Sequence, residues 1–585
     1  MSSRHFDTPE GRWTLVSEFS TEEAANQFAP HLAPSLGGDD LSAGAGDSTP
    51  ATPATPSSAK FGSAGAAMAG SGVMFSEPQA GGSAAGARAG PPPMAAPSPQ
   101  SPAHQLANRP TFVTVFHSAA AAATGECAET GRGAAGLGSS ASDSLGSRGH
   151  GFRQGVKGLA GPSSNGAAGR GIVSKSTSAF VSRVITSENM ARWIVNDSGQ
   201  SAYFLFNAPR SMVLVGRQPQ GEGGCGGGET LARLDLVSNT PLCYDVNQNT
   251  RSENRLDTIM GFVQGNMIWY EAISGKYVRL NKNSGYSPAI TSVRWIPGSD
   301  SLFMAGTADG GVMIMDCTKD EFCAPTMVPT AGRAHMGMFV SSSPHKPKCN
   351  PVVYWRLGAR PITSIAFAPD GQHVAVASED GGLRIIDYLA EVLEDVYLSY
   401  FGGLSCCAWS ADAKYVVAGG KDDLISIWCY DSQCIVARCQ GHESWVADIV
   451  FDPAGNEDGD TYRFMSVGDD ARLLVWDFSL AALHHPRAHA PRDGSPSKGA
   501  DLAATAADEL HLRGRPHSGD APSDIVRRRM PEGAVAVLQP LMSEAIHDAP
   551  LSSLHFSRSL LVTACRRGVV KVWQRPAPFD LATHL

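Results

Sequence analysis

Three consecutive stretches of this sequence repeat one pattern, and that pattern decides the fold. They read "PITSIAFAPDGQHVAVASEDGGLRIIDY" at 361–388, "LSCCAWSADAKYVVAGGKDDLISIWCY" at 404–430, and "WVADIVFDPAG" from Trp445 with "YRFMSVGDDARLLVWDF" from Tyr462. In each stretch an alternating segment ends in an aromatic residue, and these residues are 42 positions apart: Phe367, Trp409 and Phe451. A turn, a segment of small and β-branched residues, a second turn and a further strand segment follow. Alternation of period two with frequent turn signals indicates an all-β structure.

Two more copies lie on either side of these three. They are "ITSVRWIPGSDSLFMAGTADGGVMIMDC" at 290–317 and "LSSLHFSRSLLVTACRRGVVKVWQRP" at 551–576. A repeat of about 40–45 residues that ends near Trp-Asp is the signature of a WD-repeat β-propeller.

Two blades must precede the clear copies. Residues 240–281 predict a blade of four strands with a weak signature, and a further blade is predicted from 111–118, 191–199, 201–208 and 233–239. The sequence therefore predicts an all-β, seven-bladed WD-repeat β-propeller with a disordered N-terminal region and long loop insertions.

The last copy contains only three strands, so its fourth strand must come from elsewhere. The segment "WTLVSEF" at 13–19, within an N-terminal segment 1–30, is the candidate. Pairing of this segment with the last blade would close the ring, and an open ring would leave sheet edges exposed. The propeller is predicted to extend over 109–578, with a short tail at 579–585.

Gly, Ala, Ser and Pro concentrate in a few tracts of the chain, which contains 63 Gly and 38 Pro. The tracts at 31–108, 125–178 and 487–535 contain few large apolar side chains. Such composition cannot offset an ordering cost of about 1–2 kcal/mol per residue. We therefore expect 31–108 to be disordered and the other two tracts to be disordered insertions in the propeller.

Charge and hydropathy exclude several partner classes. The net charge is −9, and the one dense basic run, 527–529, lies in the polar insertion. A nucleic-acid partner is therefore not expected, and neither is a membrane, because no window approaches the roughly 18 apolar residues of a membrane span. The N-terminus lacks a secretory apolar segment, and the twelve cysteines include no C-x-x-C pair. We expect a cytoplasmic and/or nuclear protein that is monomeric on its own, without a disulfide framework.

An Asp in four of the copies lies six residues before the position at which a WD repeat places its strand-c Trp. These residues are Asp309, Asp380, Asp422 and Asp470, and the Trp itself is kept as Trp428 and Trp476. In such a blade the Asp anchors a His from the preceding loop, which in turn reaches a strand-b hydroxyl and the Trp N–H.

One copy alone has every member of this network: His442, Ser466, Asp470 and Trp476. The final copy keeps Trp573 but places Arg567 at the Asp position. We interpret these residues as structural and not as catalytic.

A search for reactive sites yields none. The Gly-rich stretch at 221–229 is not followed by the G-K-[ST] of a phosphate loop. His484, His485 and His489 lie in a polar stretch without a companion Cys or Asp at ligand spacing, which favours an exposed loop. With no nucleophile and base to pair, we predict no catalytic, metal-binding or cofactor-binding residues and no enzymatic activity.

Two large aromatic residues stand where polar residues are usual, in the loops that enter consecutive blades. They are Phe401 in "SYFGGLSC" and Trp445 in "GHESWVAD". One interpretation is a paired anchor for a protein partner, because buried aromatic residues dominate many interfaces. The alternative is that each ring packs beneath its own loop.

The residues from "NPVVYWRLGARPITSIAF" at 350 to "YRFMSVGDDARLLVWD" at 477 closely resemble the WD-repeat family of the dystrophia myotonica WD-repeat protein and the fungal catabolite-repression protein CreC. The tail from "MPEGAVAVLQPLMSEAIHDAP" is similar to that family's closing blade, and "PEGRWTL" at 9–15 is similar to a short N-terminal element. The resemblance covers about 240–480 and 530–576, and the Ala/Gly-rich N-terminal expansion departs from it.

This resemblance implies a scaffold that binds and activates a ubiquitin-specific protease, often beside a second WD-repeat protein, and a role in catabolite repression in fungi. A substrate receptor of a cullin ubiquitin ligase is the alternative. That class often carries Trp-Asp-x-Arg at the end of a blade, whereas Trp476-Asp477 is followed by Phe478-Ser479 and Trp573 by Gln574-Arg575. A propeller enzyme is disfavoured because no site was found.

Overall fold

The computed structural model describes residues 4–26, 113–117, 171–175, 178, 180–188, 190, 202–208, 210–217, 229–252, 254–281, 286–319, 321–323, 338–342, 348–453, 461–480, 483 and 535–576. In these residues nearly all regular structure is β, and the one helix is α1 (Thr21–Asn26). None of the described helical structure has the length and apolar character needed to cross a membrane.

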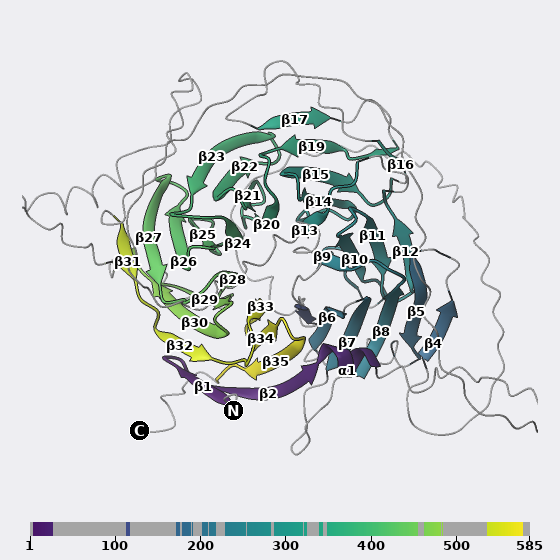
Figure 1. Cartoon of the computed structure of the whole chain (residues 1–585), viewed down its shortest axis with the longest axis horizontal. Coiled ribbons are helices and arrows are strands. Elements are labelled where there is room, and N and C mark those ends of the chain that lie inside the picture. Colours follow the sequence, from purple (N-terminus) through teal and green to yellow (C-terminus); the bar gives the residue numbers. More distant parts are fainter. Residues whose placement is uncertain are drawn as a thin grey trace, which may run out of the picture. The chain divides into compact units, whose positions relative to one another are not determined.

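Seven sheets of four to six strands form the blades, numbered here along the ring (Figure 1). Blade 1 consists, from its first to its last strand across the sheet, of β3 (Val113–His117), β6 (Ala202–Ala208), β7 (Ser211–Arg217), β8 (Glu229–Leu236), β5 (Val181–Ser187) and β4 (Gly171–Lys175). Blade 2 consists of β9 (Pro241–Val246), β10 (Asp257–Phe262), β11 (Met267–Glu271) and β12 (Lys276–Arg279). Blade 3 consists of β13 (Ile290–Trp295), β14 (Leu302–Thr307), β15 (Gly311–Asp316), β19 (Val353–Arg356) and β17 (Phe339–Ser342).

The remaining four blades contain the clear sequence copies. Blade 4 consists of β20 (Ile362–Phe367), β21 (His373–Ser378), β22 (Gly382–Asp387) and β23 (Val392–Leu398). Blade 5 consists of β24 (Leu404–Trp409), β25 (Tyr415–Gly420), β26 (Leu424–Cys429), β27 (Cys434–Gln440) and β31 (Ala536–Leu538). Blade 6 consists of β28 (Val446–Phe451), β29 (Tyr462–Gly468), β30 (Arg472–Phe478) and β32 (Met542–Ala545). Blade 7 consists of β33 (Leu551–Phe556), β34 (Leu560–Cys565), β35 (Val569–Gln574), β2 (Gly11–Ser20) and β1 (His5–Thr8).

A separate two-stranded ribbon accompanies blade 3. It is formed by β16 (Glu321–Phe322) and β18 (Cys349–Asn350), which run parallel.

The position of a strand within its blade explains its composition. Every side chain of β21 and of β25 is buried, because a middle strand has a neighbouring blade on each face. A strand buried on both faces needs continuous small and β-branched residues. The outer strand β23 has only two buried side chains, Leu393 and Tyr397, and its other positions are intermediate or exposed, because an outer strand is partly open to solvent.

Apolar clusters occupy the seven interfaces between neighbouring blades. Six of them join consecutive blades along the chain, from blades 1 and 2 to blades 6 and 7. The seventh joins blade 7 to blade 1 through residues of β34 and β35 on one side and of β6 and β7 on the other. The ring is therefore closed by packing at every interface, which confirms the predicted seven-bladed propeller.

The N-terminal strand supplies the fourth strand of the last blade. β2, which contains the segment 13–19, pairs antiparallel with β35 from Thr14 opposite Gln574 to Ser20 opposite Val569. In Figure 1 the purple β2 runs beside the yellow β35, so the two ends of the sequence lie in one sheet.

Blade 1 differs from the sequence prediction in several of its strands. Two of them, β7 and β5, were not predicted, whereas 191–199 lies outside the described residues. β4 lies inside the tract 125–178 that was predicted to be disordered, and it pairs with β5. That prediction was wrong for 171–175, because the composition of the Gly-rich tract concealed a short β-branched segment at its end.

Most of the predicted disorder falls on residues that are not described here. The tract 31–108, the rest of 125–178 apart from Ser178, and 487–534 lie outside the described residues. Val535, the last residue of the third tract, is buried just before β31.

Candidate protein-binding rim

Three large aromatic side chains lie exposed on two loops that enter blades 5 and 6. Phe401 and Tyr400 lie in the loop between β23 and β24, and Trp445 lies in the loop between β27 and β28. The exposed fractions of the side chains are 73% for Phe401, 48% for Trp445 and 39% for Tyr400. We call these three residues the aromatic rim. Phe401 is therefore largely exposed, whereas Trp445 and Tyr400 are partly covered.

Both loops of the aromatic rim contact the same turn, which joins β25 to β26. The backbone N–H of Phe401 donates to Asp422 Oδ2 at 3.2 Å. On the other side, Lys421 Nζ lies 5.0 Å from the centre of the Trp445 ring, within the range of a cation–π interaction. The two loops are therefore held on either side of one turn.

Gly402 allows the Phe401 loop to approach this turn. Its φ is +71°, a left-handed conformation that glycine adopts without steric cost. A Cβ at this position would lie 3.6 Å from Lys421 Cβ, so the backbone passes close to the turn. The carbonyl of Gly402 also accepts a hydrogen bond from Ser399 Oγ at 2.8 Å.

Charged groups border the aromatic rim. Lys421 Nζ forms an ion pair with Glu379 Oε1 at 3.1 Å, and Arg566 forms one with Asp469. Burial raises the pKa of Asp469, and the charge of Arg566 offsets part of that rise. Burial likewise raises the pKa of Asp422, and the hydrogen bond from the N–H of Phe401 offsets part of that rise. The arrangement is an apolar centre with paired charges around it, as at many protein interfaces.

The loop that carries Trp445 is fixed by the hydrogen-bond network of blade 6. His442 Nδ1 contacts Asp470 Oδ2 at 2.8 Å, and His442 Nε2 contacts Ser466 Oγ at 2.7 Å. Trp476 Nε1 donates to the same Ser466 hydroxyl at 2.8 Å. All hydrogen bonds predicted for these four residues are therefore present.

Asp470 also fixes the backbone around this network. Its carboxylate accepts the N–H of Glu443 at 3.1 Å, three residues after Gln440, the last residue of β27. Burial raises the pKa of Asp470, but the hydrogen bond and charge of His442 outweigh it, and the pKa lies below its ordinary value. The carboxylate thus stays ionised as an acceptor for the loop.

The equivalent Asp residues of the other blades have different partners. Asp309 accepts from Tyr286 OH at 2.6 Å and from Arg356 Nη1 at 3.0 Å, so a Tyr takes the place of the His. Asp380 accepts from Arg384 Nη2 at 2.6 Å within its own blade. Among the four Asp residues, Asp470 is therefore the one with a His partner in the described residues, as expected from the one copy that has every member of the network.

Trp428 lies at the Trp position of blade 5. It is buried and stacks on Tyr397, with ring centres 5.5 Å apart. It therefore packs between blades 4 and 5 and does not contribute to the aromatic rim.

Sequence reasoning missed a second, partial network in blade 7. His547 Nε2 contacts Thr563 Oγ1 at 2.9 Å, and Trp573 Nε1 donates to that hydroxyl at 3.1 Å. Burial, together with the charge of Lys571, lowers the pKa of His547 to about 3, so the imidazole is neutral. The signal was a His before the first strand of the copy and a Thr in its second strand, and the missing Asp concealed it.

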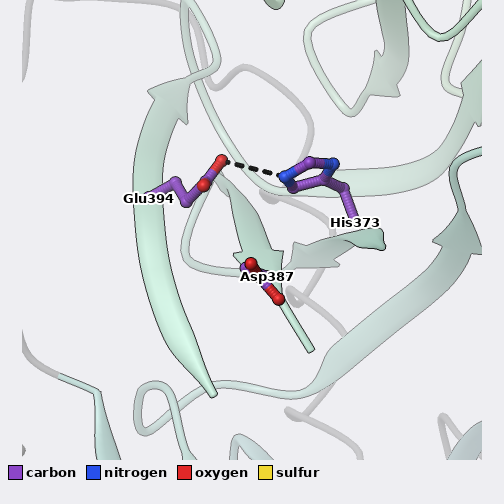
Figure 2. Close-up of side chains that lie close together, drawn as sticks. All are labelled: His373, Asp387 and Glu394. Atoms are coloured by element: carbon purple, nitrogen blue, oxygen red, sulfur yellow. Dashed lines mark ion pairs between the residues drawn. The ribbon is translucent and has the colours of Figure 1, made fainter. Parts of the chain in front are cut away.

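A second cluster of polar side chains lies in blade 4. Figure 2 shows His373, Asp387 and Glu394, whose ligand-type atoms lie within 4.8 Å of one another. A His with two carboxylates is a donor set that metals use.

Protein groups already engage each member of this cluster. His373 contacts Asp370 through Nδ1, and its Nε2 lies 2.9 Å from Tyr430 OH. Asp387 accepts the N–H groups of Leu389 and Ala390 and the side-chain amide of Gln372. The cluster is therefore an internal hydrogen-bond network, in which Tyr430 of blade 5 binds blade 4.

The histidines and the Gly-rich stretch considered as possible ligand sites fall outside the part of the chain that the structure describes. His484, His485 and His489, and all of 221–229 except Glu229, lie outside the described residues.

Comparison with known proteins agrees with this architecture. The family model "WD domain, G-beta repeat" matches residues 355–387, 397–429 and 433–477. The chain is similar to the UBP9-binding protein bun62 of Schizosaccharomyces pombe, with 35% identity over 361 residues, which cover 59% of this chain and 66% of that protein. The chain thus spans slightly less than two thirds of the relative's length.

Among solved structures, the computationally designed Ika8 protein matches with a TM-score of 0.36 and 15% identity, over 64% of this chain and 80% of that chain. That likeness is too low to bear on fold or function. The repeats, the seven closed blades and the extended match together lead to one conclusion: the chain is a WD40-repeat β-propeller protein, homologous over 59% of its length to the UBP9-binding protein bun62.

Proposed function

We propose that this chain is a non-enzymatic scaffold that binds a ubiquitin-specific protease through its aromatic rim and raises the activity of that protease. The observation that carries the proposal is the exposure of Phe401 and Trp445 on two loops held against one turn. The relative bun62 is named as a UBP9-binding protein, and this chain would share that function.

The physical reason for binding lies in the cost of exposed aromatic surface. Removing apolar surface from water contributes about 25 cal/mol per Å², and a ring that fills a partner's pocket gains most of this. Phe401 offers such a ring at low entropic cost, because Asp422 and Gly402 already fix its loop. The partner should therefore present an apolar pocket for Phe401.

The charged border gives the interface its orientation. A partner that covers Trp445 will also cover the Lys421–Glu379 pair, because Lys421 lies against the Trp445 ring. Complementary charges on the partner would fix its register and suppress wrong partners. Activation then follows if the bound propeller stabilises the active conformation of the protease, a population shift that needs no reactive group from this chain.

The test uses the full chain and a purified ubiquitin-specific protease of the UBP9 class. Binding is measured by calorimetry, and activation by cleavage of a fluorogenic ubiquitin substrate. Phe401→Ala and Trp445→Ala are each expected to weaken binding by about 2–4 kcal/mol, and the double variant by less than the sum, since neighbouring anchors share one pocket.

Leu389→Ala is the matched control, because Leu389 is equally exposed but lies in the turn between β22 and β23. It should bind and activate as the wild type does. A folded double variant that still binds and activates at the wild-type level would place the interface on another surface.

A further inference from the structure

Two cysteine thiols face each other beside blade 3. Cys323 directly follows β16, and Cys349 begins β18, the parallel partner of β16. Their Sγ atoms lie 2.8 Å apart. This contact requires no rearrangement of the chain to bring the two sulfurs together.

The backbone on both sides of the pair is fixed. The N–H of Cys323 donates to the carbonyl of Asn350 at 2.8 Å. The Asn350 side chain accepts the N–H of Asp316 at 2.9 Å and donates to the carbonyls of Asp316 and Lys319 at 2.8 and 3.1 Å. Because these bonds position both cysteines, their sulfurs meet at a high effective concentration.

The two thiols differ in access. The side chain of Cys349 is buried, whereas Cys323 is partly exposed. The contact with Cys323, burial and the Glu321 carboxylate 3.5 Å away raise the pKa of Cys349 to about 11. Cys349 therefore stays protonated, and Cys323 is the sulfur that a dissolved oxidant reaches first.

We propose that Cys323 and Cys349 form an oxidation site, at which a hydroperoxide converts the two thiols into a reversible disulfide. In the first step the Cys323 sulfur attacks the peroxide oxygen, the O–O bond breaks, and the products are a sulfenic acid and an alcohol, or water from hydrogen peroxide. In the second step Cys349 attacks the sulfenic sulfur, the S–S bond forms, and water leaves with the thiol proton. Two equivalents of a small thiol reverse the reaction by exchange, and the small thiol leaves as its own disulfide.

The covalent bond would join β16 and β18 and close a ring of chain from 323 to 349. This ring is separate from the aromatic rim, which lies in the loops that enter blades 5 and 6. The proposed oxidation site can therefore be tested independently of the proposed binding of a protease.

The experiment treats the reduced, full-length protein with a few equivalents of hydrogen peroxide. Remaining thiols are blocked, and the protein is digested with trypsin without reduction. Cleavage after Lys319, Arg333, Lys348 and Arg356 places the two cysteines in the separate peptides 320–333 and 349–356, each with a single cysteine. We expect a linked pair of these peptides, two hydrogens lighter than their sum, which separates on reduction.

Cys323→Ser should abolish the linked pair, and so should Cys349→Ser. Cys317→Ser, a change at a partly buried cysteine in the same segment, is the matched control and should leave the linked pair unchanged. Because the wild-type protein itself supplies the main result, the test does not depend on the folding of any variant. Oxidation of Cys323 to sulfinic acid without the link, or its pairing mainly with another cysteine, would overturn the proposal.

Discussion

Two tryptophans of this propeller each lie next to a cation, and they have opposite surroundings. Trp13 of β2 is fully buried, with the Arg575 guanidinium 5.9 Å from its ring centre. Trp445 is about half exposed, with Lys421 Nζ at 5.0 Å. The difference shows that one kind of side-chain pair can close the ring in one region and present a surface in another.

Trp13 belongs to the seam between blades 6 and 7. Its ring packs between Phe6 and Phe556, with centres 5.9 and 5.8 Å away, and its N–H donates to Glu10. Arg575 Nη2 forms ion pairs with Glu10 Oε2 at 2.8 Å and with Asp452 Oδ2 of blade 6 at 2.5 Å. The N-terminal strand is thus tied to two blades at once, whereas the aromatic rim has open solvent on one side.

The largest expected effect is that of Trp13→Ala. The substitution leaves a large cavity in the seam and should lower the free energy of unfolding by about 3–5 kcal/mol. Urea denaturation of the full chain measures it. Arg12→Ala, at the neighbouring exposed position, is the control and should change stability by about 0.5 kcal/mol or less. A Trp13 variant as stable as the control would show that β2 does not hold the ring closed.

The second effect concerns Asp448, which links blade 6 to blade 7. Its Oδ2 accepts the N–H of Leu554 at 2.9 Å, and burial raises its pKa from 3.8 to about 6, with the Leu554 hydrogen bond and Arg294 opposing the rise. Between these two values the folded state binds more protons than the unfolded state. Stability from this group is therefore lost as the pH rises from about 4 to 6, by up to about 3 kcal/mol.

Asp448→Asn removes this titration, so the difference in stability between variant and wild type should change over that pH range and level off above it. Chemical denaturation at several pH values measures the difference. A constant difference across the range would mean that Asp448 has an ordinary pKa in the folded protein.

A somewhat smaller effect is expected where core and rim meet, at Ser466. Ser466→Ala leaves the ring nitrogens of His442 and Trp476 without their shared partner and should cost about 1–3 kcal/mol of stability. Because the network fixes the loop of Trp445, binding of the protease should weaken as well. Thr563→Ala in blade 7 breaks the similar pair of bonds but leaves the bonds of His442 and Ser466 intact, so it should lower stability without weakening binding.

The smallest effect on folding is expected at the rim itself. Phe401→Ala and Trp445→Ala should each change the free energy of unfolding by about 0.5 kcal/mol or less, because their rings make few buried contacts. Thermal melting and urea titration check this. A loss as large as that of Trp13→Ala would remove the contrast between the two regions and make both rim residues part of the core.

The repeat pattern was enough to predict the later blades, because each copy carries its own turns and alternating strands. Blade 1 was predicted less well, since its strands are separated by Gly-rich sequence and its outer strand β4 follows such a tract directly. Composition predicts where a hydrophobic core cannot form. It does not predict that a short apolar segment at the end of such a tract, here Ile172 and Val173, pairs with a neighbouring strand.

Side-chain partners were predictable only where a motif fixes them. The bonds of His442 follow from spacing, whereas Tyr286 as the partner of Asp309 does not, because any donor of the right reach can serve. The contacts of the seam were harder still to predict, because Glu10 and Arg575 are 565 residues apart in the sequence. The position of the Phe401 loop was not predictable either, because its contact with Asp422 forms only after two loops have folded together.

The pairing of β2 with β35 has a consequence for the synthesis of the protein. Ser20 leaves the ribosome long before Val569, its partner in the sheet. At about 5–20 residues per second, the roughly 550 residues between them take about half a minute to two minutes to translate. From the time β6 and β7 are synthesised until the chain is nearly complete, their apolar faces lack the residues of β34 and β35 against which they pack. The nascent chain therefore passes through an interval in which the ring is open, and blade 7 can be completed only near the end of translation.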